Sequence, residues 1–319
     1  MELTRPVLKA HTPASLPLDA LDQSYRTHLH GRRLEELRSG GMDVVVGKRE
    51  GGRFQDRRTG KWLWNCHSNG GTYNLGHRNP GVIATVRAAM DEVDMGNHHM
   101  PSAWRTLAAQ KLAATTNNLL PGVVFSASAS ECNEVAMKLA RFHNGRSRII
   151  TAHGCYHGTT IKTLACTVEL AERYGFAQPE FVSVPWNDLS ALDAALDDSV
   201  GLVMLEAIPA TCGFPMPDAG YLRGVERLCR ERGALLLIDE VQTGLGRSGQ
   251  AWSYQHDGIV PDILITGKGL SGGVYPIAAA LFSEELFATW SEAPRFHLST
   301  FGGAEIGCAV AAHVCEVTI

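Results

Sequence analysis

Short apolar runs alternate with longer amphipathic stretches over most of the chain from about residue 105 onward. Runs that are apolar on both faces are typical of buried strands, whereas the stretches between them have a helical period. The expected strands are Val123–Phe125, Arg148–Thr151, Phe181–Val184, Leu202–Ala207, Ala234–Ile238 and Ile263–Thr266. The expected helices are Glu131–Phe142, Leu189–Leu196 and Tyr221–Glu231. This alternation predicts an α/β fold built on a mainly parallel sheet flanked by helices.

The first part of the chain has a less regular pattern. Gln23 to Arg38 fits a polar helix, and Val44–Val46 and Lys61–Trp64 fit strands separated by turns. Pro80 is placed to open a further helix, because proline is favoured at the first helical position. One face of that helix would be apolar and carry Val82, Val86, Met90 and Val93.

Composition narrows the class of protein. Of the 319 residues, 45% are hydrophobic and 19% charged, and the formal net charge is −4. These values exclude overall disorder and argue against a general nucleic-acid binder, which needs a basic surface. The apolar runs are too short to span a membrane, and the first 20 residues contain no continuous apolar stretch typical of a signal peptide. The eight cysteines form no CxxC pair, which indicates reduced thiols in a cytoplasmic protein.

Two charged residues follow apolar strands, where ligands bind in parallel sheets. Asp239 comes directly after ALLLI, and a carboxylate there needs a cationic partner or hydrogen-bond donors; a structural ion pair explains it equally well. Lys268 lies between Gly267 and Gly269 after a strand, in a chain with seven lysines and 22 arginines. A lysine held against a ligand there can lose its proton and attack a carbonyl, although an exposed loop lysine has the same pattern.

Two further segments near strand ends can bind ligands. Ser128 and Glu131 fit a helix capping box, and the same helix start, with its small hydroxyl residues, can bind an anion. The glycine-rich loop that follows the expected strand Arg148–Thr151 carries Tyr156 and His157, which suit stacking on a flat ligand. Zinc is a weaker alternative, because His153, Cys155 and His157 have no fourth ligand at a recognised spacing. We interpret His98-His99 as structural.

Gly244 to Gly249 match the pattern G-x-G-x-x-G of dinucleotide-binding proteins. That fingerprint should follow a strand immediately and open a helix. Here three residues intervene after the strand, and the sequence that follows is polar and loop-like. A nicotinamide site is therefore a minor alternative.

The order of these features resembles one known family. The stretches VVFSASASECNEVAMKLAR, YHGTT, LLLIDEVQTGLGRSG, HDGIVPDILITGKGLSGG and STFGGAEIGCAVA are similar to class III aminotransferases, which are fold type I enzymes dependent on pyridoxal 5'-phosphate. The resemblance covers roughly residues 40–319 and implies the large domain of that fold, with a seven-stranded type of sheet. We expect residues 1–75 to form an N-terminal segment belonging to a small domain and residues 76–319 to form the cofactor-binding large domain.

The resemblance also implies roles for the residues of the site. Lys268 would form the Schiff base with the cofactor and shuttle a proton, for which its pKa must fall. Asp239 would face the pyridine nitrogen of the cofactor. Ser128, Ala129 and Ser130 would bind the cofactor phosphate, and Tyr156 would stack on the ring with His157 beside it. Gln242 would reach the ring hydroxyl, and Glu206 would lie on the substrate side. Thr300 would reach the phosphate bound by a partner subunit.

Because the matching threonine of the family reaches a neighbouring subunit, the resemblance at Thr300 implies a homodimer with shared active sites.

The chain differs from the family pattern at two positions, since Ala129 replaces a glycine and Ala207 replaces a proline. The C-terminal small domain of the family, with its carboxylate-binding arginine, is expected to be absent after Ile319.

The expected function is transfer of an amino group from an amino acid, ω-amino acid or amine to a 2-oxo acid. Three alternatives stay open: an aminomutase, a decarboxylating transaminase or a racemase on the same scaffold. A fourth is a truncated, non-catalytic chain that binds the cofactor. The donor, the acceptor and the stereochemistry are not encoded in these motifs.

Overall fold

The computed structural model describes residues 16–96 and 100–319. The chain divides into two compact units, Met1–Cys66 and His67–Ile319, and each is described by itself. The division at residue 75 expected from the sequence stays a prediction. His98 and His99, and the first 15 residues, lie outside the described part of the chain.

The first unit contains two helices and a small antiparallel sheet. The helices are α1 (Leu18–His28) and α2 (Gly31–Ser39), and the strands pair in the order β1 (Val46–Glu50), β2 (Arg53–Asp56) and β3 (Trp62–Trp64). The single helix expected from Gln23 to Arg38 was therefore wrong. The chain leaves helical geometry at Leu29, where φ is −120° and ψ is −100°, and restarts with the His30 ring accepting a hydrogen bond from the Arg33 amide.

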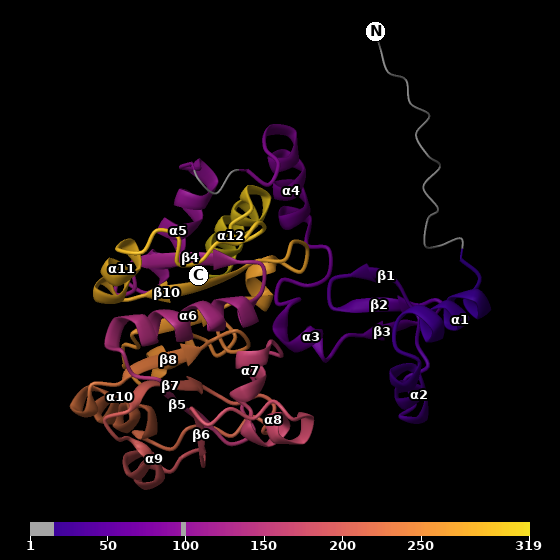
Figure 1. The fold of residues 1–319 in the computed structure, drawn as a ribbon. Helices are drawn as coiled ribbons and strands as arrows, with labels where there is room; N and C mark the ends of the chain where they lie inside the picture. Colours follow the sequence, from indigo (N-terminus) through magenta and orange to yellow (C-terminus); the bar gives the residue numbers. More distant parts are fainter. Residues whose placement is uncertain (1–15, 97–99) are drawn as a thin grey trace. The chain divides into compact units, whose positions relative to one another are not determined.

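The second unit is built on a seven-stranded sheet with the order β4-β10-β9-β8-β7-β5-β6 (Figure 1). Its mainly parallel character confirms the expectation, and each expected strand is present. Only β10 is antiparallel to its neighbours, β4 and β9. The strands are β4 (Gly122–Ser126), β5 (Arg148–Ala152), β6 (Phe181–Val184), β7 (Val200–Glu206), β8 (Leu235–Asp239), β9 (Ile263–Thr266) and β10 (Ala278–Phe282). The central strands β7, β8 and β9 are almost entirely buried, as their apolar runs predict.

Helices flank this sheet, and α6 packs against the strands β4, β7, β9 and β10 (Figure 1). The longer helices are α4 (Pro80–Glu92), α5 (Ala103–Thr115), α6 (Ala129–Asn144), α10 (Tyr221–Arg232) and α12 (Glu305–Thr318). The shorter ones are α3 (Ser68–Gly71), α7 (Ile161–Ala165), α8 (Val168–Tyr174), α9 (Leu189–Ala195) and α11 (Glu284–Ser291). Over residues 16–96 and 100–319, no helix combines the length and the apolar character needed to cross a membrane.

The apolar face expected for α4 is only partly correct. Val82 is fully buried, but Met90 is 63% exposed and Val93 lies beyond the end of the helix. Helix α6 begins as its sequence predicts. The hydroxyl of Ser128 accepts a hydrogen bond from the Glu131 amide at 3.3 Å, while the Glu131 carboxylate reaches back to the amide of Ala127 at 3.0 Å.

Glu240 is a buried carboxyl group that organises the loop after β8. It is 1% exposed, and its carboxyl group accepts hydrogen bonds from the amide of Tyr254 at 2.8 Å and from the hydroxyl of Thr243. Burial raises its pKa to about 7, despite these donors. The folded protein therefore binds this proton more tightly than the unfolded chain does.

This raised pKa predicts a pH dependence of stability. The contribution of Glu240 to the free energy of unfolding is fully present below the unfolded pKa of about 4.5 and is lost as pH rises through 7. Relative to Glu240→Gln, the wild-type protein should lose up to about 3 kcal/mol of stability between pH 4.5 and 8. Urea unfolding at several pH values measures this difference. Glu231→Gln, on the surface of α10, is the matched control, and equal pH profiles for wild type and Glu240→Gln would contradict the prediction.

Candidate active site

A cavity of about 330 Å³ opens at the carboxyl ends of the parallel strands. Glu206 and Asp239 are the last residues of β7 and β8, and the two strands pair in parallel with these residues opposite each other. Lys268 follows β9 by two residues and reaches the same cavity. The lining residues are Thr72, Ala127, Ser128, Ala129, Ser130, Tyr156, His157, Gly158, Glu206, Asp239, Val241, Gln242, Lys268, Ser271, Pro276 and Ile277.

The amino-terminal turn of α6 forms one wall of the cavity. Ser128, Ala129 and Ser130 line it, and the amide groups at a helix start attract an anion. Gly158 comes so close to this turn that a Cβ at that position would lie 2.1 Å from Ser130 Oγ. The positive φ of Gly158, 123°, also disfavours other residue types. The loop after β5 and the start of α6 are thus held together by a position that only glycine fills.

Asp239 is the centre of a buried hydrogen-bond network. His157 Nδ1 lies 2.8 Å from Asp239 Oδ2, and Asn133 Nδ2 donates to the same oxygen at 3.1 Å. The amide of Val241 donates to Asp239 Oδ1 at 3.1 Å. Burial disfavours charge on the imidazole, but the nearby Cys155 and the Asp239 carboxylate outweigh this effect and raise the pKa of His157 well above its usual value.

Glu206 and Tyr156 meet on the neighbouring side of the cavity. The Glu206 carboxylate accepts hydrogen bonds from the amides of Tyr156 at 3.0 Å and Ala210 at 3.3 Å. Burial raises the pKa of Glu206, and the charge of Asp239 adds to that rise. The side chain of Tyr156 stays 40% exposed, so its ring is accessible from the cavity.

Lys268 occupies a strained position in the backbone. Its φ is +39°, in the left-handed region that costs a residue with a side chain about 1 kcal/mol or more. A Cβ at Gly267 would lie 3.3 Å from the methyl group of Ala129, and one at Gly269 would lie 2.9 Å from Asn74 Nδ2. Burial lowers the pKa of Lys268, against the opposing charges of Asp239 and Glu206. The chain therefore holds an amine with reduced proton affinity next to two carboxylates.

The structure brings together nine of the ten residues singled out from the sequence; the tenth, Thr300, is exposed and does not line this cavity. Sequence analysis did not identify Asn133 and Val241, which both donate hydrogen bonds to Asp239. Asn133 is completely buried among apolar neighbours on α6, and a polar residue within an apolar helical face was the available signal. Val241 is close to Asp239 in sequence, but its apolar side chain gave no sign of a role.

The two alternative ligand patterns have no matching geometry in the described residues. Residues 244–249 form turns that open no helix, unlike a dinucleotide fingerprint. Among residues 16–96 and 100–319, no three His, Cys, Asp or Glu side chains are grouped so that they could hold a metal ion.

Comparison with known sequences places the chain in a family. The sequence model of aminotransferase class III matches residues 37–319. An uncharacterized aminotransferase from Archaeoglobus fulgidus is 44% identical over 297 residues, which cover 93% of this chain and 70% of that protein.

Solved structures have the same fold. The ornithine aminotransferase from Toxoplasma gondii superposes with a TM-score of 0.84 at 28% identity, covering 94% of this chain and 71% of that one. A taurine:2-oxoglutarate aminotransferase from Bifidobacterium kashiwanohense, solved with pyridoxal phosphate and glutamate, has a TM-score of 0.82. At 24% identity, covering 90% of this chain and 73% of that one, it supports the fold alone. The chain belongs to the class III aminotransferases, a pyridoxal-phosphate-dependent family of fold type I.

Proposed function

We propose that this protein is a transaminase that uses Lys268 to hold pyridoxal phosphate. It would move an amino group from an amino acid, ω-amino acid or amine to a 2-oxo acid. The observation that carries the proposal is the shared cavity of Lys268, with its lowered pKa, and the buried carboxylate of Asp239. The cofactor, when bound, supplies an electron-withdrawing ring that stabilises negative charge on the carbon losing a proton.

The described residues fit this cofactor. The anionic phosphate matches the amino-terminal turn of α6 with Ser128 and Ser130, where Gly158 leaves the space that a side chain would fill. We propose that Ala129 binds there through its amide, and that its methyl group, which lies against Gly267, reduces the room available. The ring would lie between Tyr156 and Val241, both of which line the cavity, with Gln242 beside it.

Lys268 can serve as the attachment point and as the proton carrier. Burial lowers its pKa, so a larger fraction of its Nζ is neutral at a given pH than for an exposed lysine. A neutral amine is needed to attack a carbonyl carbon, and the same Nζ can afterwards accept and return a proton. Asp239 and Glu206 limit this shift in pKa, since both carboxylates favour the ammonium form.

Asp239 would keep the ring nitrogen of the cofactor protonated. Its Oδ2 accepts a hydrogen bond from Asn133 and faces a His157 ring whose pKa is raised, so the side chain is fixed in place. Glu206 would face the substrate. Its raised pKa places its proton exchange closer to neutral pH than that of a free glutamate.

Homodimerisation and a cytoplasmic location are further parts of the proposal. Thr300 is exposed and outside the cavity of its own chain, which supports a role at the phosphate of a partner subunit. The eight cysteines are free thiols, as expected in a reducing compartment. The similar protein from Toxoplasma gondii is an ornithine aminotransferase, so ornithine, with a 2-oxo acid as acceptor, is the first amino donor to assay.

Replacing Lys268 should remove both covalent cofactor binding and catalysis. We expect Lys268→Ala to give no borohydride-reducible cofactor adduct by mass spectrometry and to lower transamination by about 10²–10⁴-fold or more, because the proton carrier is gone. Lys48→Ala, which alters an exposed lysine on β1, is the control and should behave as wild type. A reducible adduct at normal occupancy in Lys268→Ala would disprove the assignment.

Replacing Asp239 should affect turnover more than cofactor content. Asp239→Asn keeps an oxygen that can accept from Asn133 but loses the negative charge, so kcat should fall by about 10²–10³-fold. Bound cofactor, measured by its near-visible absorbance, should stay close to the wild-type amount. Asp262→Asn is the matched control. Asp262 lies at the amino-terminal end of β9, away from the cavity, and its carboxylate accepts a hydrogen bond from the Leu236 amide. A kcat within threefold of wild type for Asp239→Asn would refute this role.

Product analysis with and without a 2-oxo acid separates transamination from the other reactions of the scaffold. Turnover that needs no acceptor would identify an aminomutase, racemase or decarboxylating enzyme. Cofactor binding without turnover of any donor would identify a non-catalytic binding protein.

A further inference from the structure

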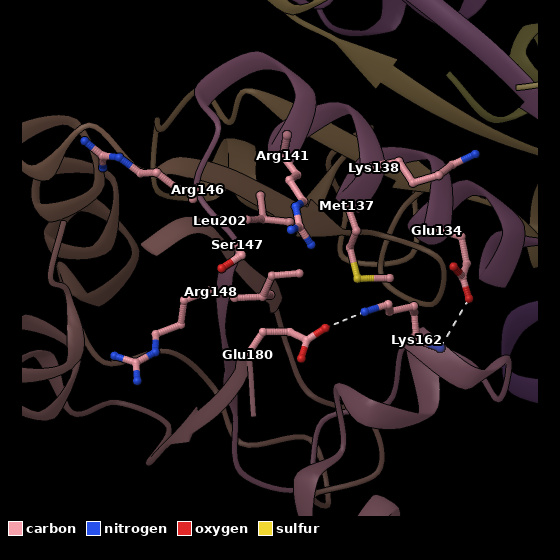
Figure 2. Close-up of a pocket in the computed structure, with 13 residues that line it drawn as sticks. Glu134, Met137, Lys138, Arg141, Arg146, Ser147, Arg148, Lys162, Glu180 and Leu202 are labelled. Atoms are coloured by element: carbon pink, nitrogen blue, oxygen red, sulfur yellow. Dashed lines mark hydrogen bonds and ion pairs between the residues drawn. The ribbon is translucent and has the colours of Figure 1, made fainter. Parts of the chain in front are cut away.

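A second cavity, of about 240 Å³, is lined by residues of α6 and α7 and by residues on or next to the strands β5, β6 and β7 (Figure 2). It shares no lining residue with the cavity that holds Lys268. Helix α6 contributes five lining residues, namely Glu134, Met137, Lys138, Ala140 and Arg141. Most of the other lining residues come from Arg146–Ile149 at the start of β5, from Glu180 before β6 and from Gly201 and Leu202 on β7.

Most charged groups around this cavity already have partners. Lys162 and Glu180, which both line the cavity, form an ion pair that lowers the pKa of Glu180. Arg148 pairs with Asp197 at 2.8 Å, and Arg146 Nη1 donates to the backbone oxygens of Arg232 and Gly233. In Figure 2 both arginine side chains point away from the centre of the cavity.

Arg141 is different. Among the described residues its side chain has no hydrogen-bond or ion-pair partner, and Figure 2 shows its guanidinium directed between Leu202 and Glu180. Its charge acts on Glu180 only as a long-range contribution, weaker than that of Lys162. The guanidinium therefore keeps its donors available for a ligand.

The cavity beneath Arg141 is apolar. Met137, Ala140, Ile149 and Leu202 are at least nine-tenths buried and line it. Lys138 also lines the cavity, but its ammonium group lies over the Phe296 ring. A cavity with an apolar floor and a charged group directed into it is typical of a site for a small organic ligand, in which the charged group fixes the orientation.

We propose that this cavity binds a small organic monocarboxylate with an apolar body. The carboxylate pairs with Arg141 through two parallel hydrogen bonds, and the body packs on Met137 and Leu202. Glu134 and Glu180 also line the cavity, but Glu180 is paired with Lys162 and Glu134 accepts a hydrogen bond from the Thr160 hydroxyl, so neither carboxylate pairs with Arg141. A single carboxylate satisfies the Arg141 guanidinium, which has no hydrogen-bond or ion-pair partner among the residues that the structure describes.

The experiment titrates the cofactor-loaded protein with 4-fluorophenylacetate, observed by ¹⁹F NMR, and with 4-fluorophenylacetamide as the neutral probe. The amide should bind much more weakly, because it cannot form the charged pair. Arg141→Gln should weaken carboxylate binding about tenfold or more. Arg87→Gln, which changes an exposed arginine on α4, should leave the affinity unchanged.

Glu180→Gln provides a test with the opposite sign. It removes a repelling carboxylate and releases Lys162, so the same probe should bind up to about fivefold more tightly. Equal affinity in wild type and Arg141→Gln would place the probe elsewhere, including the cofactor cavity, and would overturn the proposal. Weaker binding in Glu180→Gln, or equal binding of the neutral amide, would overturn it as well.

Discussion

The burial of one carboxylate at the end of β8 organises the whole site. A buried charge is costly unless partners compensate for it. Asp239 obtains these partners from segments far apart in the sequence: Asn133 on α6, His157 after β5 and the amide of Val241 in its own loop. His157 and Val241 line the cavity, and Asn133 donates a hydrogen bond to the backbone oxygen of His157. The hydrogen bonds that stabilise the buried carboxylate therefore also position the walls of the cavity.

Helix α6 connects this site with the rest of the unit. Its first turn faces the cofactor cavity, its Asn133 supports Asp239, and its later turns border the second cavity around Arg141. The two cavities therefore have no lining residue in common, but both border α6. The carboxyl ends of parallel strands all meet at one edge of the sheet, which explains why Glu206, Asp239 and Lys268 lie together there.

The apolar pattern alone predicted the parallel strands but could not show the direction of β10. The run Tyr275–Phe282 has the same character as the others, and periodicity says nothing about strand direction. Between β9 and β10 the chain forms a 3₁₀ turn at Lys268–Ser271 and has no crossover helix, so it returns antiparallel. The break between α1 and α2 was missed for a related reason, since a polar surface helix has no apolar face to reveal where it ends.

The sequence by itself determined the fold class, the family and the chemical types present at the strand ends. These follow from local features: apolar runs, the capping residues of α6, and glycines on either side of Lys268. Tertiary structure alone decided that Asn133 bonds to Asp239, that the pKa of Lys268 falls through burial, and that Arg141 lies over an apolar cavity without a partner among the described residues. The physical reason is that hydrogen-bond partners and burial depend on segments distant in sequence, whose approach no local pattern records.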